Sequence, residues 1–198
     1  MNYQFTNTWF ADTANWGGII PIMKGRKEFL EIGCYEGQST VFTVNNMMQD
    51  GGVIYCVDTW GGGEEHQNDD MAKVESRFDH NINMLKTKHD GRRRIEKMKG
   101  SSYQKLVEIA FGLGEDAAFD FIYIDGSHIA KDVLSDACMC WPMLKPGGLL
   151  VFDDYLWGDR RDILHRPKVA VDAFMNIFAE EVQPVYMGGQ LIVAKGNL

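Results

Sequence analysis

Acidic residues stand at the ends of several short apolar runs in this chain, at positions where side chains can do chemistry. These acids are Glu31, Asp58, Asp125, Asp153 and Asp154. In open α/β sheets, ligands bind beyond the carboxyl ends of the strands, so acids at these ends indicate a binding site. A buried core strand would gain nothing from them.

Two glycines follow the first of these acids in the segment Phe29–Thr40, whose sequence is FLEIGCYEGQST. An apolar run, a turn and a small polar start in this order indicate a strand, a tight turn and a helix N-terminus. Gly33 and Gly37 let the backbone turn and approach a ligand without an intervening Cβ atom. The segment predicts a loop that faces a nucleotide-like ligand, although an ordinary strand-to-helix turn has the same pattern.

Asp58 lies about 20 residues beyond Gly37, where an acid can accept hydrogen bonds from both ribose hydroxyls of an adenosine. The alternative is that Asp58 caps the next helix. Together, the glycines and Asp58 favour an adenosine-containing ligand. The glycine spacing differs from the GxGxxG of NAD-binding loops, and Tyr35 stands in the turn, so a ligand without a pyrophosphate fits better.

The remaining acids predict a cation site. Asp125, Asp153 and Asp154 follow two strands that we expect to be neighbours, about 4.8 Å apart. Close carboxylates cannot all stay ionised without a cation, and oxygen ligands suit Mg²⁺ or a similar hard ion. The alternative is that one Asp caps a helix while another is solvated. His128, just after Asp125, is either a general base or a loop histidine that caps the next helix.

Alternating strands and helices must position these residues. After residue 26, short apolar runs alternate with helical patterns, which predicts βαβ units and a parallel sheet. Only Gly188-Gly189 separates the last two predicted strands, so we expect an antiparallel hairpin there. The predicted strands are 27–33, 53–58, 94–99, 119–125, 147–153, 182–187 and 190–195.

Helices are predicted where apolar residues share one face of a helical pattern. One such face carries Met71, Val74, Phe78, Ile82 and Leu85, and a second carries Tyr103, Leu106, Val107, Ala110 and Phe111. A third helix is expected over 130–141, stopped by Pro142, and a fourth uses Ala170, Phe174, Ile177 and Phe178.

Composition limits the class of protein. A formal net charge of −8 and a pI near 5.1 disfavour nucleic acid as a partner, and we interpret the basic stretch Lys86–Lys99 as a solvated turn. Four cysteines without a CxxC pair predict buried, reduced thiols rather than a zinc site. The sequence shows neither a charged leader nor a long apolar run, so we expect a cytoplasmic protein without a membrane partner.

Several motifs together resemble class I S-adenosylmethionine-dependent methyltransferases. LEIGCYEGQST, VDTW, FIYIDGSH and LKPGGLLVFDDY look like the small-molecule O-methyltransferase family that includes macrocin and cephalosporin-pathway enzymes. The resemblance covers residues 29–178, and DGSH followed by GGxxxxDDY is its most specific part.

This resemblance implies an α/β fold. The expected architecture is a Rossmann-like three-layer α/β/α sandwich around a seven-stranded, mostly parallel sheet, whose antiparallel C-terminal strand is inserted beside the fifth strand. We expect one methyltransferase domain over 1–198, with an aromatic-rich helical cap at 1–26 and a Rossmann-like core at 27–198.

The resemblance also implies S-adenosylmethionine as the cofactor. Its methionine part would face Glu31 and the two loop glycines, its ribose would bind Asp58, and its adenine would lie beside Trp60 and two serines. Many relatives have a glycine where Tyr35 stands. The expected cofactor contacts are Glu31, Gly33, Tyr35, Gly37, Ser39, Asp58, Thr59, Trp60, Ser101, Ser102 and Asp125.

Metal-dependent relatives carry acids at the positions of Asp125, Asp153 and Asp154, so the resemblance agrees with the electrostatic prediction of a Mg²⁺-like ion. Such a metal would bind the substrate hydroxyl and aim its oxygen at the methyl group. Some relatives carry an acid at the position of Ser127, and a serine cannot replace it as a base. The expected catalytic residues are therefore His128 and Asp125.

The chain is thus predicted to methylate a hydroxyl of a sugar or another small molecule, with a homo-oligomer left open. Two segments, Gly61–Asp70 and Leu156–Pro167, are expected to define the substrate, the second through Arg160, Arg161 and His165. Three alternatives remain: a metal-free methyltransferase that uses His128, with nitrogen as an alternative acceptor atom, a nicotinamide-dependent oxidoreductase, and a non-catalytic cofactor-binding protein. The missing GxGxxG disfavours the second, and the intact acids disfavour the third.

Overall fold

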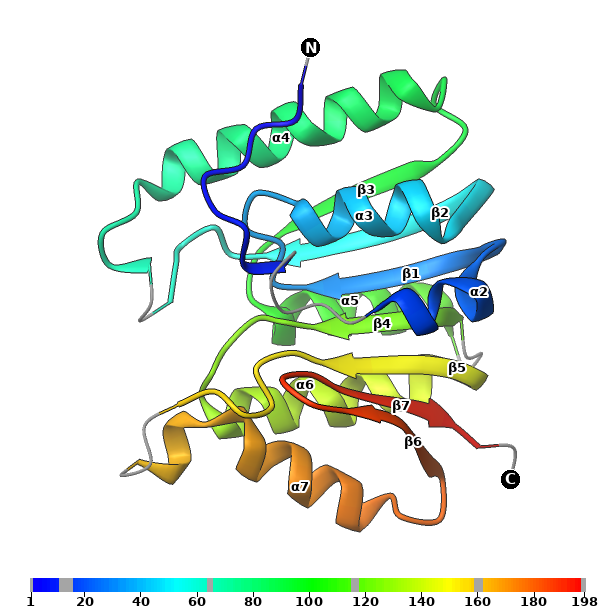
Figure 1. Cartoon of the computed structure of the whole chain (residues 1–198), viewed down its shortest axis with the longest axis vertical. Helices are drawn as coiled ribbons and strands as arrows, with labels where there is room; N and C mark the ends of the chain where they lie inside the picture. Colours follow the sequence, from blue (N-terminus) through cyan, green and yellow to red (C-terminus); the bar gives the residue numbers. More distant parts are fainter. Residues whose placement is uncertain (1, 11–15, 64–65, 115–117, 159–161, 197–198) are drawn as a thin grey trace. The chain divides into compact units, whose positions relative to one another are not determined.

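The computed structural model describes residues 2–10, 16–63, 66–114, 118–158 and 162–196 (Figure 1). The chain divides into two compact units, Met1–Ser101 and Ser102–Leu198. Each unit pairs its own strands and packs helices of its own against them, such as α3 on β2 in the first unit and α6 on β4 in the second.

In the first unit, three parallel strands carry candidate site residues just beyond their carboxyl ends. Ile32 pairs with Val57 in the register of β1 and β2, so Gly33 and Asp58 follow at the same edge of the sheet. The strand order is β3-β2-β1, with β1 at Arg26–Ile32, β2 at Met48–Asp58 and β3 at Arg94–Lys99. The helices are η1 Trp16–Gly18, α2 Ile20–Met23, α3 Gln38–Asn46 and α4 Met71–Lys88.

In the second unit, one parallel pair is extended by an antiparallel hairpin. The strand order is β4-β5-β7-β6, with β4 at Phe119–Ile124, β5 at Leu144–Phe152, β6 at Val182–Met187 and β7 at Leu191–Lys195. β7 pairs antiparallel with both β5 and β6. The helices are α5 Ser102–Leu113, α6 Ala130–Met143, η3 Ile163–His165 and α7 Pro167–Ile177.

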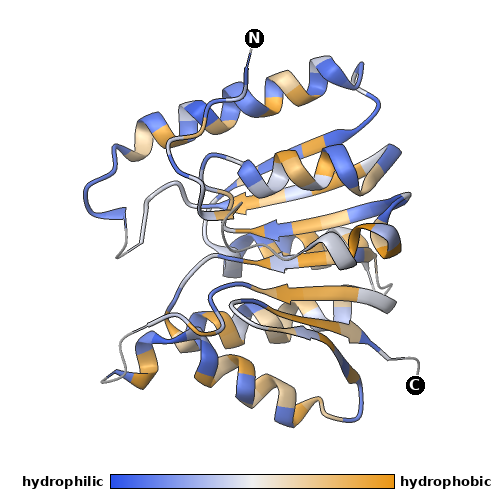
Figure 2. Cartoon of the chain, in the orientation of Figure 1, coloured by the Kyte–Doolittle hydropathy of each residue, from blue (hydrophilic) through white to orange (hydrophobic). Residues whose placement is uncertain are grey.

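This strand pattern confirms the predicted fold class. The pairs β1–β2, β2–β3 and β4–β5 are parallel, and the C-terminal strand is inserted beside β5 as expected. All of β4 is buried, and Figure 2 shows hydrophobic residues along β4, β5 and β7. Strands covered on both faces read as continuous apolar runs, which is why these segments were readable from the sequence.

β2 and β5 begin earlier than predicted, and in β2 a glycine pair lies inside the added part of the strand. β2 starts at Met48 rather than at 53, and β5 starts at Leu144 rather than at 147. The register between β1 and β2 shifts at Gly51-Gly52, as in a β-bulge. A Cβ atom at Gly52 would lie 2.7 Å from the backbone oxygen of Lys27, so only glycine allows β1 to approach there. A glycine pair that marks a bulge was mistaken for a turn.

The predicted buried face is right for α4, whereas in α5 only Leu106 of the predicted face is buried. The buried residues of α4 include Val74, Phe78, Ile82 and Leu85. In α5 the buried residues are Leu106 and Ile109, whereas Tyr103, Val107 and Phe111 are 65%, 48% and 90% exposed. Apolar residues surround α5 on several sides, so spacing alone did not select the side that packs.

The end of α6 also differs from the prediction. Pro142 lies inside its last turn, and the helix ends at Met143. A proline there removes one N–H and disturbs the carbonyl of Cys138, which is exposed, so solvent can satisfy that carbonyl. The exposure of Cys138 corrects the expectation of buried thiols, although Cys34, Cys56 and Cys140 are buried and all four cysteines are free.

The N-terminal segment contributes only short helices to the described structure. Residues 2–8 have no regular secondary structure, and η1 and α2 follow after residue 16. Within the described parts of the chain, every helix is too short or too polar to span a bilayer.

Replacing Phe174 with alanine should lower the free energy of unfolding by about 3–5 kcal/mol. Its ring is fully buried against Trp141 and Phe152. Ile177 lies on the same helix, was predicted on the same face and is 69% exposed, so Ile177→Ala should cost less than about 0.5 kcal/mol. Urea denaturation of both variants measures the difference, and equal losses would mean that α7 buries another face.

Candidate functional site

The glycine loop that follows β1 turns through three residues in the left-handed backbone region. Gly33, Tyr35 and Gly37 have φ values of 82°, 48° and 79°. A Cβ atom at Gly37 would meet the ring of Phe78 at 3.0 Å, so both conformation and space demand glycine there. Tyr35 adopts this conformation at an energetic cost, which the surrounding contacts must offset.

The Asp58 carboxylate holds this loop in shape. Its Oδ2 atom accepts hydrogen bonds from the backbone N–H groups of Cys34 and Tyr35, at 2.8 and 2.9 Å. Its Oδ1 atom accepts one from the N–H of Trp60, at 2.6 Å. A carboxylate offers about four lone-pair sites, so Asp58 retains room for about one further donor.

Glu31 joins the end of β1 to the first turn of α3. Its side chain is 2% exposed and accepts hydrogen bonds from the hydroxyls of Ser39 and Thr40, the latter at 2.5 Å. Burial raises the pKa of Glu31 to about 7, against the lowering effect of the two hydroxyls. The structure therefore brings the two predicted cofactor contacts Glu31 and Ser39 together, and they form a hydrogen bond with each other.

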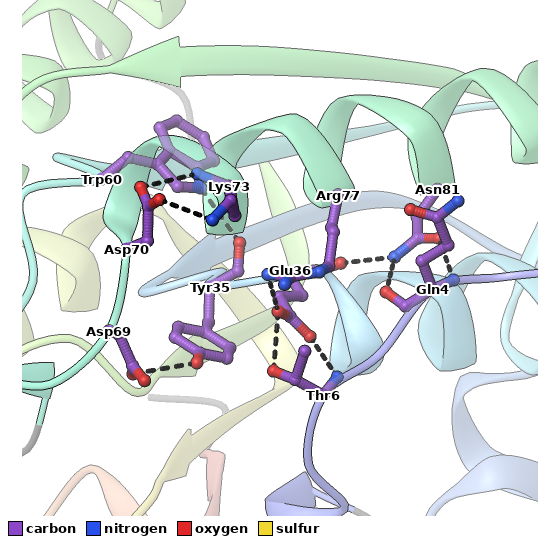
Figure 3. Close-up of polar contacts among 10 residues, drawn as sticks. All are labelled: Gln4, Thr6, Tyr35, Glu36, Trp60, Asp69, Asp70, Lys73, Arg77 and Asn81. Atoms are coloured by element: carbon purple, nitrogen blue, oxygen red, sulfur yellow. Dashed lines mark hydrogen bonds and ion pairs between the residues drawn. The ribbon is translucent and has the colours of Figure 1, made fainter.

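Tyr35 makes contacts that a glycine could not make. Its ring stacks on His66 with centroids 4.9 Å apart and lies 5.3 Å from the ring of Trp9. Its hydroxyl donates to Asp69 at 3.0 Å (Figure 3). Burial, together with the charge of Asp69, raises the pKa of Tyr35 to about 12. Through Tyr35, the loop therefore contacts two segments that are distant in sequence, one at Trp9 and one at 66–69.

Trp60 supports the loop from the protein interior. It is 4% exposed, its ring lies 4.8 Å from that of Phe78, and the Lys97 ammonium sits 4.5 Å over it. The indole Nε1–H donates to the backbone oxygen of Tyr35 at 2.9 Å. Thr59 lies beside it, and its hydroxyl accepts from the N–H of Gly61.

The two serines predicted beside the adenine fall in different units. Ser101 is exposed at the end of the first unit. Ser102 begins α5 in the second unit, and its hydroxyl binds the Asp136 carboxylate. Burial raises the pKa of Asp136 to about 6, and the hydrogen bond from Ser102 opposes that rise.

In the second unit, the acids after β4 and β5 come together around a tyrosine. The Tyr123 hydroxyl contacts Asp125 Oδ2 at 2.9 Å and also Asp153 Oδ2. Burial and then the charge of Asp154 raise the pKa of Asp153, and burial raises that of Tyr123. The single hydroxyl proton of Tyr123 is thus shared between the carboxylates of Asp125 and Asp153.

His128 is fixed by the neighbouring acid and by a tryptophan. Its Nε2 atom lies 2.8 Å from Asp154 Oδ2, and its ring centroid is 4.0 Å from that of Trp157. Asp154 has a left-handed backbone with φ 52°. His128 and the acids Asp125, Asp153 and Asp154 line one small cavity of about 10 Å³, close to the volume that one water needs.

Neither Tyr123 nor Trp157 was singled out as a site residue from the sequence, although Trp157 lies in the segment expected to define the substrate. Tyr123 lies in the buried strand β4, and its sequence context is typical of a core residue. The one available signal is that a buried tyrosine hydroxyl needs a hydrogen-bond partner. Ser127, in contrast, has an ordinary role, since its hydroxyl donates to Asp132 and accepts from the N–H of Ile129 at the start of α6.

Comparison with known sequences decides the family. The profile of a family described as a methyltransferase domain matches residues 30–155, which is more than half of the chain. The chain belongs to this methyltransferase family. The match spans the glycine loop, Asp58 and all of the acids after β4 and β5, and it confirms the methyltransferase activity predicted from the motifs. No curated protein matches the methyltransferase in sequence.

Solved structures share the fold of the methyltransferase at low identity. An O-methyltransferase from Bacillus cereus in complex with SAH has a TM-score of 0.65 and 18% identity, over 98% of this chain and 84% of that one. TomG from Streptomyces achromogenes, an O-methyltransferase of tomaymycin synthesis in complex with SAM, has a TM-score of 0.67 and 14% identity, over 90% and 77%.

MycE, a methyltransferase of the mycinamycin biosynthetic pathway in complex with Mg, SAH and mycinamycin VI, has a TM-score of 0.60 and 19% identity. The alignment covers 98% of this chain but only 51% of MycE, so the methyltransferase spans about half of that protein. Similarity at these identities supports the fold alone.

The three acids are not a preformed three-ligand site in the methyltransferase. Among the described residues, the only group of three candidate ligand atoms within 4.8 Å of one another belongs to Glu31, Cys34 and Cys56. Burial raises the pKa of the Cys34 thiol, and the Glu31 carboxylate is already engaged by hydroxyls.

The segments expected to define the substrate are partly described. Arg160 and Arg161 lie outside the described residues. His165 lies 3.7 Å from Asp162. Between 156 and 164, the described part of the segment exposes large apolar side chains: Leu156, Trp157, Ile163 and Leu164.

The raised pKa of Glu31 makes a testable contribution to stability. Because this pKa is about 7 in the folded methyltransferase and 4.5 for the solvated side chain of the unfolded chain, the stabilisation is complete below pH 4.5 and is lost as the pH rises through 7. Relative to Glu31→Gln, the wild type should lose about 3 kcal/mol of unfolding free energy over this range.

Denaturation at several pH values between these limits measures this loss. Glu180→Gln, at an exposed position, is the matched control and should follow the wild type. An identical pH dependence for wild type and Glu31→Gln would contradict the assignment.

Proposed function

We propose that this methyltransferase uses S-adenosylmethionine and transfers its methyl group to a hydroxyl of a small molecule, such as a sugar. The observation that carries the proposal is the glycine loop held by Asp58, which accepts hydrogen bonds from the N–H groups of Cys34 and Tyr35. O-methyltransferases of similar fold, in complex with SAM or SAH, support the choice of cofactor and acceptor atom.

The residues of the loop fit such a cofactor. Gly33 and Gly37 bring the backbone close to a ligand. The N-terminus of α3 offers backbone N–H groups, and the positive end of the helix dipole there favours a negatively charged group of the ligand. Asp58 has acceptor capacity left for one ribose hydroxyl. When bound, the cofactor supplies an electrophilic methyl group on a sulfonium. Glu31 is engaged with Ser39 and Thr40, so its part is to fix the loop.

The acids after β4 and β5 fit a hard cation in chemistry and in space. They offer oxygen ligands around a cavity of about 10 Å³, and Mg²⁺ is often held by only one or two carboxylates together with waters. We propose that Asp125 and Asp154 would hold the ion, with Asp153 fixed by Tyr123. When bound, the ion would lower the pKa of the acceptor hydroxyl.

His128 is proposed as the base that removes the hydroxyl proton. A neutral imidazole that donates its Nε2–H to Asp154 presents the lone pair of Nδ1 as the proton acceptor. Trp157 packs against the ring and restricts its orientation. Asp154 therefore orients the base in addition to its proposed part at the cation.

The pair between His128 and Asp154 also favours a second candidate, a metal-independent methyltransferase. At 2.8 Å this contact already provides an oriented base. Among the described residues, Asp125, Asp153 and Asp154 do not bring one oxygen each within 4.8 Å of one another, which favours a reaction that needs no ion.

Calorimetry should detect S-adenosylmethionine binding and no NAD binding by the wild type. Asp58→Asn should weaken S-adenosylmethionine binding at least about tenfold, because an amide nitrogen would then face the N–H donors of the loop. Asp90→Asn, at an exposed position far along the chain, is the matched control. Absence of heat with S-adenosylmethionine, or heat with NAD, would refute the proposed cofactor.

The cation can be tested separately with Mn²⁺ as a paramagnetic probe. In the presence of S-adenosylmethionine, the wild type and Asp90→Asn should bind about one Mn²⁺, and Asp154→Asn should bind it at least about tenfold more weakly. Electron paramagnetic resonance measures the free ion. With a panel of hydroxylated acceptors, methyl transfer should stop in chelator. Transfer that persists in chelator would select the metal-independent candidate.

A further inference from the structure

The N-terminal strap, residues 2–10, is bound to the first unit through alternate residues. The His80 Nε2 atom lies 3.2 Å from the backbone oxygen of Asn2. The N–H of Gln4 donates to Asn81 Oδ1 at 2.7 Å, and Asn81 Nδ2 donates back to the oxygen of Gln4 at 2.8 Å. This period of two is typical of an extended segment, and over residues 2–6 the strap binds α4 in this way.

The next alternate residue, Thr6, binds the glycine loop itself. Its N–H donates to Glu36 Oε2 at 2.6 Å, and its hydroxyl donates to Glu36 Oε1 at 2.8 Å (Figure 3). Glu36 stands between Tyr35 and Gly37 and is 2% exposed. Arg77 of α4 contacts Glu36 Oε1 at 2.9 Å. The buried carboxylate thus depends on Thr6 for two of its charge-assisted hydrogen bonds.

Asn81 makes a second link between the strap and the loop. It is completely buried, and while it pairs with Gln4 its Nδ2 atom also donates to the backbone oxygen of Glu36 at 2.8 Å. The strap is therefore linked to Glu36 in two ways: Thr6 binds the side chain of Glu36, and Asn81, which pairs with Gln4, binds its backbone oxygen.

The strap also reaches the ring of Tyr35 at its other end. Trp9 lies 5.3 Å from Tyr35 and 5.7 Å from His66. Tyr35 has the costly left-handed backbone of the loop, so contacts on both sides of it, to Glu36 and to its ring, help to hold that conformation.

We propose that docking of the N-terminal strap is coupled to cofactor binding, with Glu36 as the positioning residue that joins them. This inference rests on the proposed function, because the ligand of the loop is taken to be S-adenosylmethionine. When the strap leaves, Glu36 loses the donors of Thr6, and the turn that presents Gly33 to Gly37 is less well fixed. Coupling is reciprocal, so a bound cofactor must hold the strap in place by the same factor.

Conservative variants of Thr6 test the coupling in the whole 198-residue chain. Thr6→Val removes one donor to Glu36 at an exposed position, and Thr6→Ser keeps it. Thr87→Val is the matched control, since the Thr87 hydroxyl binds only within α4, to Asn83. Calorimetry with S-adenosylhomocysteine, the product form of the cofactor, measures affinity, and hydrogen exchange measures opening of residues 2–10.

The expected result is a loss of affinity of about fivefold in Thr6→Val, with Thr6→Ser and Thr87→Val close to the wild type. Saturating S-adenosylhomocysteine should slow exchange of the strap amides in the wild type by at least as much. If Thr6→Val opens its strap faster yet binds with wild-type affinity, the coupling is refuted while the proposed function stands. If the wild type binds no S-adenosylhomocysteine, the proposed function fails and the coupling fails with it.

Discussion

One carboxylate, that of Asp58, holds the glycine loop of this methyltransferase together. The loop packs three left-handed residues into five positions and leaves backbone N–H groups pointing inward. Asp58 accepts from two of these groups and from the next turn of its own segment. A carboxylate acceptor at the end of β2 is thus a precondition for the shape of the loop, before any ligand arrives. The residue that would bind the ribose is the same residue that builds the site.

The second unit meets a different constraint, which is the crowding of negative charge. Each acid after β4 and β5 has a neighbour that can donate a hydrogen bond to its carboxylate. Tyr123 lies between Asp125 and Asp153, and His128 lies against Asp154. These partners tie the chemistry of the acids to a proton on a tyrosine and a proton on an imidazole. A cation and a base would therefore compete for, or share, the same oxygens.

The sequence was sufficient for features that depend on local rules. The glycine loop, the acid after β2 and the hairpin of β6 and β7 follow from turn chemistry and from strand ends, and they lie where they were expected. Features that depend on distant partners escaped prediction. Glu36 reads as a solvated loop acid, and only the fold brings Thr6 and Arg77 to it. The packed face of α5 is likewise selected by its neighbours and not by its own pattern.

The contacts that shape the glycine loop come from a single continuous stretch of chain. Asp58, Glu36, Arg77 and Asn81 all lie before Ser101, the last residue of the first unit. During synthesis the strap leaves the ribosome before α4 and finds its partners only when α4 has followed. From that moment, all of these contacts can form while the second unit is still being translated. The order of the elements along the chain therefore lets the glycine loop and its contacts form before the acids that follow β4 and β5 have been made.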